Sequence, residues 1–450
     1  MSHAVARLLN FKSGEMPLAL RSAAFYFTVL CGYFFLRPVR EAMGVSRGMG
    51  DLRWLFITTS AVSLVIVLVF GGVVSRTDRR RFIPVGYGFV VVCLLVFAGL
   101  LTVDAFAGGG LIGSDAETGT ARAVGYTYYV WLSVISLFVN SLFWSFMVDV
   151  FDADQGKRMF AFIGIGGTLG ALVGGWATTT VSGLTDSVHL PAGLMLVGAA
   201  LFAGSIALML DLDRQAVASR HSRLGADVSG GGSAAPVGGQ FWTGLTTLVR
   251  SPYLLGIALY IMLMAVSNTL IYFTQASIIL ESTDTFSQRV GSFAQFDMLA
   301  QLATLLTQIF VTTRLIQRLG VGGTLLVMPL VTVLGFAVLA VWPLYGVMMI
   351  FAALHRASRY AVSRPARETL FSVVPAETKY KAKPLIDVFL YRGGDVAGAG
   401  LEGGLKAAGL TIAGLAWATV PLAGVWGVLC LALGRAQQRK LAGEPSGRGR

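Results

Sequence analysis

Long apolar stretches separated by short polar ones dominate the chain. Each stretch has about the 20 residues that an α-helix needs to cross a bilayer, and the short alternating segments of a β-barrel do not recur. The pattern predicts twelve spans, near residues 22–43, 53–75, 82–103, 124–149, 158–181, 190–212, 251–275, 289–313, 321–342, 344–363, 384–405 and 409–433. We therefore expect an all-α polytopic membrane protein.

One polar stretch interrupts the series in the middle. Residues 213–250 contain DRQAVASRHSR and SGGGSAAPVGG, and the second of these has the composition of a flexible linker. We expect a six-helix bundle at 1–212, a cytoplasmic linker at 213–250, a second six-helix bundle at 251–433 and a cytoplasmic tail at 434–450.

The two halves carry a weak internal repeat. GGTLGA at 166–171 and GGDVAG at 393–398 both follow a charged cluster, and the match places the fifth predicted helix on the eleventh in the same orientation. Parallel six-helix repeats are the layout of major facilitator transporters, whose substrate site lies between the repeats near the bilayer midplane.

Charge is sparse and unevenly distributed. Only 13% of residues are charged, against about 25% in a soluble domain. Most of the 35 lysines and arginines lie in the N-terminal segment, the even-numbered loops and the C-terminal segment, which are cytoplasmic by the positive-inside rule. The net charge of +12 is therefore a topology signal rather than a nucleic-acid footprint. We expect a bacterial-type inner membrane protein with both termini cytoplasmic, in contact with lipid and monomeric.

Enzymatic signatures do not occur in the sequence. There is no phosphate-binding loop followed by a helix, no set of nucleophile and base, and no metal-ligand spacing among the four histidines. Cys31, Cys93 and Cys430 lie far apart in apolar stretches and are expected to be packing residues. The prediction is a protein that is not an enzyme and that has no cofactor and no metal.

The most unusual stretch is residues 379–404. Lys379, Lys381 and Lys383 precede it, and four charged residues then fall within an apolar run, namely Asp387, Arg392, Asp395 and Glu402. A charge at bilayer depth costs roughly 2.5–3.5 kcal/mol on insertion scales, so it usually faces a protein interior or a water-filled cavity. A polar helix with many glycines fits a transport pathway.

Further charges lie in two other predicted helices. Arg37 and Arg40 are three residues apart on one face of the first helix, where they could form a cationic wall for an anionic substrate or extend to the outer headgroups. Asp297 lies well inside the eighth helix and needs a partner. Arg392 is its most attractive mate, although Arg392 could instead pair with Asp395 on its own helix.

Two loops are candidate gates. GGVVSRTDRRRFIP at 71–84, with Asp78 and Arg79, resembles the loop signature of major facilitator transporters, in which opposite charges latch the cytoplasmic side; a topology anchor is the alternative. A second latch would set Asp149, Asp152 and Asp154 against Lys157 and Arg158, with a solvated ion-pair loop as the alternative. Lys379 is a further gate candidate at the cytoplasmic mouth.

Three stretches resemble the ATP:ADP antiporter family of plastids and intracellular bacteria. They are LRPVRE at 36–41, FWSFMVDVFDADQGKRMFAFIGIGG at 143–167 and RYAVSRPARETLFSVVPAETKYKAKPLIDV at 359–388. The resemblance implies a major facilitator fold and nucleotide exchange. It places a basic site residue at Arg40 and a functional lysine at Lys381 or Lys383.

The chain departs from the family at its acidic positions. The corresponding stretches are YVWLSVISLF at 129–138 and NTLIYFTQ at 268–275, and neither contains an acid. The cationic half of the family's site is thus retained and the acidic half is missing, which supports an anionic substrate and argues against strict ATP/ADP exchange.

Together these patterns predict a secondary active exchanger of an organic anion, a nucleotide or another phosphorylated metabolite. The alternatives are a transporter or sensor of lipid headgroups and a membrane scaffold without transport. The expected substrate-binding residues are Arg37, Arg40, Asn140, Asn268, Gln275, Asp297, Lys381, Lys383 and Arg392. Among them, Asn140, Asn268 and Gln275 would supply uncharged polar contacts.

Overall fold

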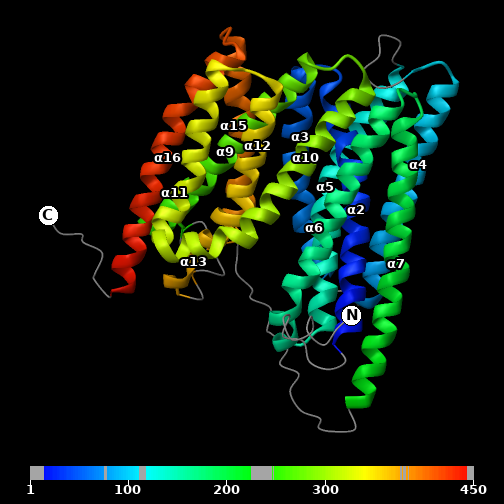
Figure 1. The fold of residues 1–450 in the computed structure, drawn as a ribbon, viewed down its shortest axis with the longest axis horizontal. Helices are drawn as coiled ribbons and strands as arrows, with labels where there is room; N and C mark the ends of the chain where they lie inside the picture. Colours follow the sequence, from blue (N-terminus) through cyan, green and yellow to red (C-terminus); the bar gives the residue numbers. More distant parts are fainter. Residues whose placement is uncertain are drawn as a thin grey trace. The chain divides into compact units, whose positions relative to one another are not determined.

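The computed structural model describes residues 15–74, 79–110, 118–223, 246, 248–375, 378, 382–383 and 385–442. All regular structure in these residues is helical (Figure 1), which confirms the all-α expectation. The helices are α2 (Met16–Val45), α3 (Met49–Val74), α4 (Arg79–Phe106), α5 (Gly119–Val150), α6 (Ala153–Leu184), α7 (Leu190–Arg223), α9 (Pro252–Glu281), α10 (Phe286–Phe310), α11 (Thr312–Val341), α12 (Tyr345–Ala357), α13 (Arg364–Leu370), α15 (Tyr391–Ala407) and α16 (Ile412–Leu441), with η1 (Ser358–Ser363), η2 (Phe371–Val373) and η3 (Leu385–Leu390) as short helical segments.

Within the described residues, nine helices are long and apolar enough to cross a membrane. They are α2 to α7, α9, α11 and α16. The other three predicted spans are also helical, as α10, as α12 with η1, and as η3 with α15. These three are short or carry charged residues. The count of twelve spans therefore stays a prediction.

The contacts divide the chain into two compact units. Unit 1 comprises Met1–Arg47, Val65–Ala234 and Thr283–Met298, and unit 2 comprises Gly48–Leu64, Ala235–Ser282 and Leu299–Arg450. The units thus differ from the two halves of the sequence by two segments. Gly48–Leu64, which includes part of α3, belongs to unit 2, and Thr283–Met298, which includes the start of α10, belongs to unit 1. The division at 212 and 251 remains a prediction.

Unit 1 is built around α2, which packs against α5, α6 and α7. Figure 1 shows these helices side by side. Gly166, Gly170 and Gly174 recur every fourth residue on α6, and a Cβ at any of them would collide with the α2 backbone. Small residues at this spacing let two membrane helices approach closely.

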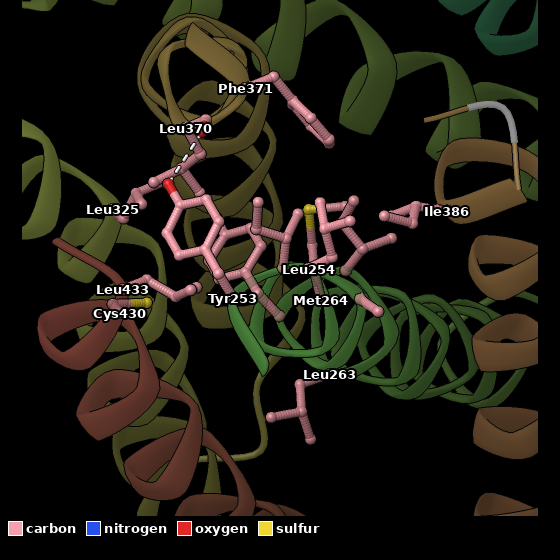
Figure 2. Packing of buried hydrophobic residues seen from close by; sticks show 14 of the residues in the cluster. Tyr253, Leu254, Leu263, Met264, Leu325, Leu370, Phe371, Ile386, Cys430 and Leu433 are labelled. Carbon is pink, nitrogen blue, oxygen red and sulfur yellow. Dashed lines mark hydrogen bonds between the residues drawn. The ribbon is translucent and has the colours of Figure 1, made fainter. Parts of the chain in front are cut away.

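Unit 2 has α9 at its centre, in contact with α15 and α16, while α11 packs on α16. Its buried apolar cluster joins these helices to the segment after α12 (Figure 2). The Tyr253 hydroxyl donates a 2.8 Å hydrogen bond to the Leu370 carbonyl inside this cluster. The bond fixes the end of α13 against the start of α9.

Helix α7 extends into the expected linker at 213–250, whose bounds stay a prediction. Residues 213–223 continue α7 to Arg223 instead of leaving the helix at 213. Arg21 of α2 contacts the first part of this extension, because its Nε lies 3.3 Å from Asp211 Oδ2 and its Nη1 donates to Gln215 Oε1 at 2.5 Å. These contacts hold α7 in helical form at its polar end.

Two segments of unit 2 are π-helical, η1 and η3. A π-segment carries an extra residue per turn and is often found at functional sites. Arg359 lies in η1, and Tyr391 and Arg392 directly follow η3. These three residues belong to the charged cluster described below.

Candidate functional site

Arg37 and Arg40 of α2 are both neutralised by acids. Arg37 Nη1 lies 2.9 Å from Asp297 Oδ1 on α10, and its Nε lies 3.6 Å from Glu41 Oε1. Arg40 pairs with Glu41, donates from Nη1 to Ser133 Oγ at 2.9 Å and lies 5.1 Å from the ring centre of Tyr129. These two arginines form an ion-pair network rather than extending toward headgroups.

The expected pairing of Asp297 with Arg392 is therefore wrong. Asp297 pairs with Arg37, because the start of α10 belongs to unit 1. Arg392 Nη1 instead lies 3.1 Å from Asp395 Oδ2, three residues along the same helix. This local pair is the alternative that the sequence spacing left open.

Asn140 lies on the exposed side of α5 in unit 1. Its Oδ1 accepts a 2.9 Å hydrogen bond from the hydroxyl of Tyr26 on α2. The Tyr26 ring stacks on Phe143 at 4.1 Å and meets Trp144 edge-on at 5.4 Å. An oriented amide thus lies beside an aromatic group.

Unit 2 contains a set of charged and polar residues that we call the Arg359 cluster: Thr269, Arg359, Tyr391, Arg392 and Asp395. Arg359 donates to the Tyr391 hydroxyl and lies 5.3 Å from the centre of that ring. Thr269 Oγ1 lies 3.4 Å from Asp395 Oδ1, and the Asp395 side chain is almost fully buried. Sequence reasoning did not name Arg359 as a site residue, although it lies near the end of the predicted span 344–363; the structure places Arg359 in η1.

The Arg359 cluster carries an excess of positive charge. Its described residues include two guanidinium groups, those of Arg359 and Arg392, and one carboxylate, that of Asp395, which forms its ion pair with Arg392. Removing a charge from water is expensive unless a partner offsets it. The cluster is therefore suited to an anionic group that supplies the second negative charge.

Asn268 and Gln275 lie on α9 of the same unit. Asn268 Nδ2 is buried and has no hydrogen-bond partner among the residues that the structure describes. Most buried donors in native proteins are paired, so this amide is available to a ligand. Gln275 is buried, with 3% of its side chain exposed.

Lys383 is held by a surface network rather than exposed as a free cation. Its Nζ lies 2.5 Å from Glu368 Oε2 and 5.5 Å from the ring centre of Phe371. Arg367 Nη2 extends the network to Asp387 Oδ1 at 3.7 Å. Lys379 and Lys381 lie outside the described residues, so the choice between Lys381 and Lys383 stays open.

Sequence reasoning also missed the pairing of Arg53 with Glu402. Arg53 of α3 donates from Nε and, at 3.4 Å, from Nη2 to the two carboxylate oxygens of Glu402 on α15. The Glu402 side chain is 1% exposed. Glu402 was recognisable as an intramembrane acid, but nothing in the sequence linked it to a residue 349 positions away.

The gate candidates are only partly described. Asp78 lies outside the described residues, and Arg79 begins α4 with a side chain that is not described. Asp152 caps α6: its Oδ1 accepts from the Gln155 amide at 2.8 Å, and Gln155 Oε1 accepts in return from the Asp152 amide. The side chains of Lys157 and Arg158 are not described, so the second latch stays a prediction.

The chain matches the protein-family model of the TLC ATP/ADP transporters over residues 122–431. It is 23% identical to ADP,ATP carrier protein 1 of Chlamydia pneumoniae over 447 residues, which cover 87% of this chain and 85% of the relative. The carrier of the same name from Chlamydia muridarum (strain MoPn / Nigg) is 22% identical, with 87% and 82% covered.

Solved transporters share the fold. The nucleoside transporter NupG, in a mutant form, superposes with a TM-score of 0.61 at 13% identity, covering 94% of this chain and 99% of NupG. A bacterial homologue of the iron transporter ferroportin gives 0.59 at 12% identity, with 91% and 98% covered. The POT family transporter PepTSo gives a TM-score of 0.58 at 14% identity, with 93% and 98% covered.

These likenesses confirm a major facilitator-like fold for a multi-pass membrane protein. The family match extends over most of the chain and describes transporters rather than enzymes. The chain belongs to the TLC ATP/ADP transporter family.

Proposed function

We propose that this protein exchanges a phosphorylated organic anion, a nucleotide in the first place, across a bacterial inner membrane by alternating access. The observation that carries the proposal is the excess positive charge of the Arg359 cluster. Membership of the ATP/ADP transporter family supports the nucleotide. The Lys and Arg distribution supports cytoplasmic termini.

The guanidinium groups of Arg359 and Arg392 are the phosphate ligands in this proposal. A planar guanidinium binds phosphate oxygens through two parallel charge-assisted hydrogen bonds. Asp395 holds Arg392 in place from one side, and the Asn268 amide offers a further donor on α9.

The same charge balance favours exchange over one-way release. Without substrate, the partly buried guanidinium of Arg359 has no carboxylate of its own among the described residues, which is unfavourable in a low dielectric. A bound phosphate removes that cost. The loaded protein therefore changes conformation more easily than the empty one, and a carrier that returns only when loaded is an exchanger.

Lys383 fits a role in substrate capture. Its partner Glu368 is 44% exposed, and exposed ion pairs contribute only about 0–1 kcal/mol. An incoming phosphate can therefore displace Glu368 from Lys383 at little cost. The Arg392 side chain is 20% exposed and that of its partner Asp395 only 5%, so Arg392 is placed to hold the anion more tightly than Lys383.

Binding to the purified protein tests this function. Thermal stabilisation should be measured with ADP, ATP, a phosphosugar and an anionic phospholipid, for the wild type and for Arg359→Ala and Arg392→Ala. We expect nucleotides to stabilise the wild type and each variant to bind at least about tenfold more weakly, since a charged hydrogen bond is worth about 1.5–3 kcal/mol.

Lys406→Ala is the matched control, because Lys406 is also a cation of α15 but lies in its last turn. It should bind like the wild type. Stabilisation by phospholipid alone would favour a lipid transporter or sensor, and no response to any compound would favour a scaffold. Unchanged nucleotide affinity in both arginine variants would remove the Arg359 cluster from the site.

A further inference from the structure

The exposed face of α5 carries more polar side chains than the exposed face of α4, another helix of unit 1. On α4 the exposed large side chains are Val85, Phe89, Val92, Leu95, Val96, Leu100, Val103 and Phe106. Between residues 131 and 145 of α5 the side chains that are not buried are Trp131, Ile135, Ser136, Leu137, Asn140, Ser141, Trp144 and Ser145. Polar groups within a membrane span usually face water or a ligand rather than lipid, so this face of α5 is suited to contact a solute.

Asn140 is the hydrogen-bonding group on that face. Tyr26 donates to its Oδ1 at 2.9 Å, which orients the amide so that Nδ2 and one lone pair of Oδ1 remain for another partner. Trp144 lies four residues further along α5 and therefore on the same side. Its ring is partly exposed and is held edge-on by Tyr26 at 5.4 Å and by Phe160 at 5.4 Å.

An oriented amide beside an indole has the chemistry of a nucleobase site. The NH2 group of a carboxamide can donate to N7 of adenine while its carbonyl oxygen accepts from the 6-amino group. Guanine presents two acceptors, N7 and O6, at the same edge, so it leaves the carbonyl oxygen without a donor. An aromatic ring adds stacking worth about 1–3 kcal/mol per base.

We propose that Tyr26, Asn140 and Trp144 form a nucleobase subsite in unit 1 that selects 6-aminopurines. The proposal rests on the proposed function, because the base belongs to a nucleotide that the protein must bind. Asn140 contacts the edge of the base, Tyr26 orients Asn140, and Trp144 stacks.

The same residues could serve only to join α2 to α5. The Tyr26–Asn140 hydrogen bond would then contribute to stability, and its loss would weaken the binding of every nucleotide equally. The ratio of adenine to guanine affinity separates the two roles, because a structural bond cannot change that ratio.

Equilibrium binding of labelled ADP and GDP to the purified full chain in detergent gives this ratio. The wild type should prefer ADP. In Asn140→Asp the donor to N7 is lost, while the carboxylate can accept from N1–H and the 2-amino group of guanine. The preference should therefore invert, with ADP affinity falling about tenfold or more, as expected for one good edge contact worth about 1–3 kcal/mol.

Two further variants and a control complete the experiment. Asn140→Ala should bind ADP and GDP equally, and Tyr26→Phe should keep binding but lower the preference. Ser141→Ala should keep the wild-type ratio, because the neighbouring Ser141 hydroxyl donates to the Leu137 carbonyl of its own helix.

The outcomes separate this proposal from the function on which it rests. Nucleotide binding with the same ADP:GDP ratio in wild type, Asn140→Asp and Asn140→Ala would overturn the nucleobase subsite alone. A wild type that binds neither nucleotide would overturn both.

Discussion

At the scale of single residues, the charges inside the apolar runs occur in pairs. Arg37 pairs with Asp297, Arg53 with Glu402 and Arg392 with Asp395. The acid of each pair is nearly buried, and a buried ion that loses its partner is strongly destabilising. The Lys383–Glu368 pair is more exposed, so its loss should have a smaller effect.

Asp395→Asn should therefore cost far more stability than Glu368→Gln. The first leaves both arginines of the Arg359 cluster without a carboxylate and should cost about 3–5 kcal/mol, whereas the second should cost about 1 kcal/mol or less. Thermal unfolding of the two purified variants measures the difference. Equal shifts in Tm would contradict this interpretation of the cluster.

Sequence spacing revealed some of these partners and not others. The Arg392–Asp395 pair could be anticipated because three residues along a helix is a contact distance. The Arg37–Asp297 and Arg53–Glu402 pairs could not, because their members are 260 and 349 positions apart and no local rule joins them. Arg359 was missed because it follows His355 and Arg356 in a basic stretch, which is typical of a cytoplasmic helix end.

At the scale of elements, α9 and α15 meet through glycines. A Cβ at Gly398 would lie 2.8 Å from Thr269 Cβ and 3.1 Å from the Val266 carbonyl, whereas a Cβ at Gly400 would meet nothing within 4 Å. This approach brings Thr269 to Asp395. Close helix packing thus positions one side of the Arg359 cluster.

Gly398→Ala and Gly400→Ala should have opposite effects. The first forces α9 and α15 apart and should lower both Tm and nucleotide affinity. The second adds helix propensity, worth up to about 1 kcal/mol, on an exposed face and should leave affinity unchanged. Thermal unfolding with and without ADP compares them, and a tolerated Gly398→Ala would show that the close contact is not needed.

Asp152 caps the N-terminus of α6: its side chain accepts from the Gln155 backbone amide, and the Gln155 side chain accepts from the Asp152 backbone amide. Variants of Asp152 can therefore separate a capping role from a gating role. Asp152→Ala should cost about 1 kcal/mol, and Asp152→Ser, which keeps a capping oxygen, should cost much less. Thermal unfolding measures both variants. If Asp152 acts as a gate and not as a cap, both variants would change transport rates equally and leave Tm unaltered.

The helical elements were the most predictable feature of the chain. Apolar length predicted the nine described helices that are long and apolar enough to cross a membrane, because a membrane accepts only segments that satisfy their own backbone hydrogen bonds. The extension of α7 to Arg223 was not predicted, and the contacts of Arg21 with Asp211 and Gln215 join residues too far apart in the sequence to be anticipated. The π-helical segments likewise leave no periodic signal.

At the scale of the whole molecule, each compact unit includes a segment from the other half of the sequence. Gly48–Leu64 belongs with the C-terminal helices, where Phe56 stacks on Tyr272 at 5.4 Å. Thr283–Met298 belongs with the N-terminal helices. One ion pair ties down each segment, namely Arg53–Glu402 in unit 2 and Arg37–Asp297 in unit 1. The sequence repeat predicted two bundles but gave no sign of this exchange.

Charge reversal tests whether the Arg53–Glu402 pair is needed for transport. Arg53→Glu and Glu402→Arg alone place like charges together and should each lower the initial rate of nucleotide uptake at least about tenfold. The double variant restores an opposite-charge pair and should recover much of that rate. A double variant no faster than either single one would show that the pairing does not matter.

Uptake into proteoliposomes tests the central claim most directly, namely that the Arg359 cluster binds the phosphate of an exchanged nucleotide. Labelled ADP is supplied outside vesicles that are either empty or preloaded with unlabelled ADP, for wild type, Arg359→Ala, Arg392→Ala and the control Lys406→Ala. We predict fast uptake only into preloaded vesicles, equal rates for wild type and Lys406→Ala, and rates lower by at least about tenfold for the two cluster variants. Equal uptake by all four proteins, or equal uptake into empty and preloaded vesicles, would contradict the account.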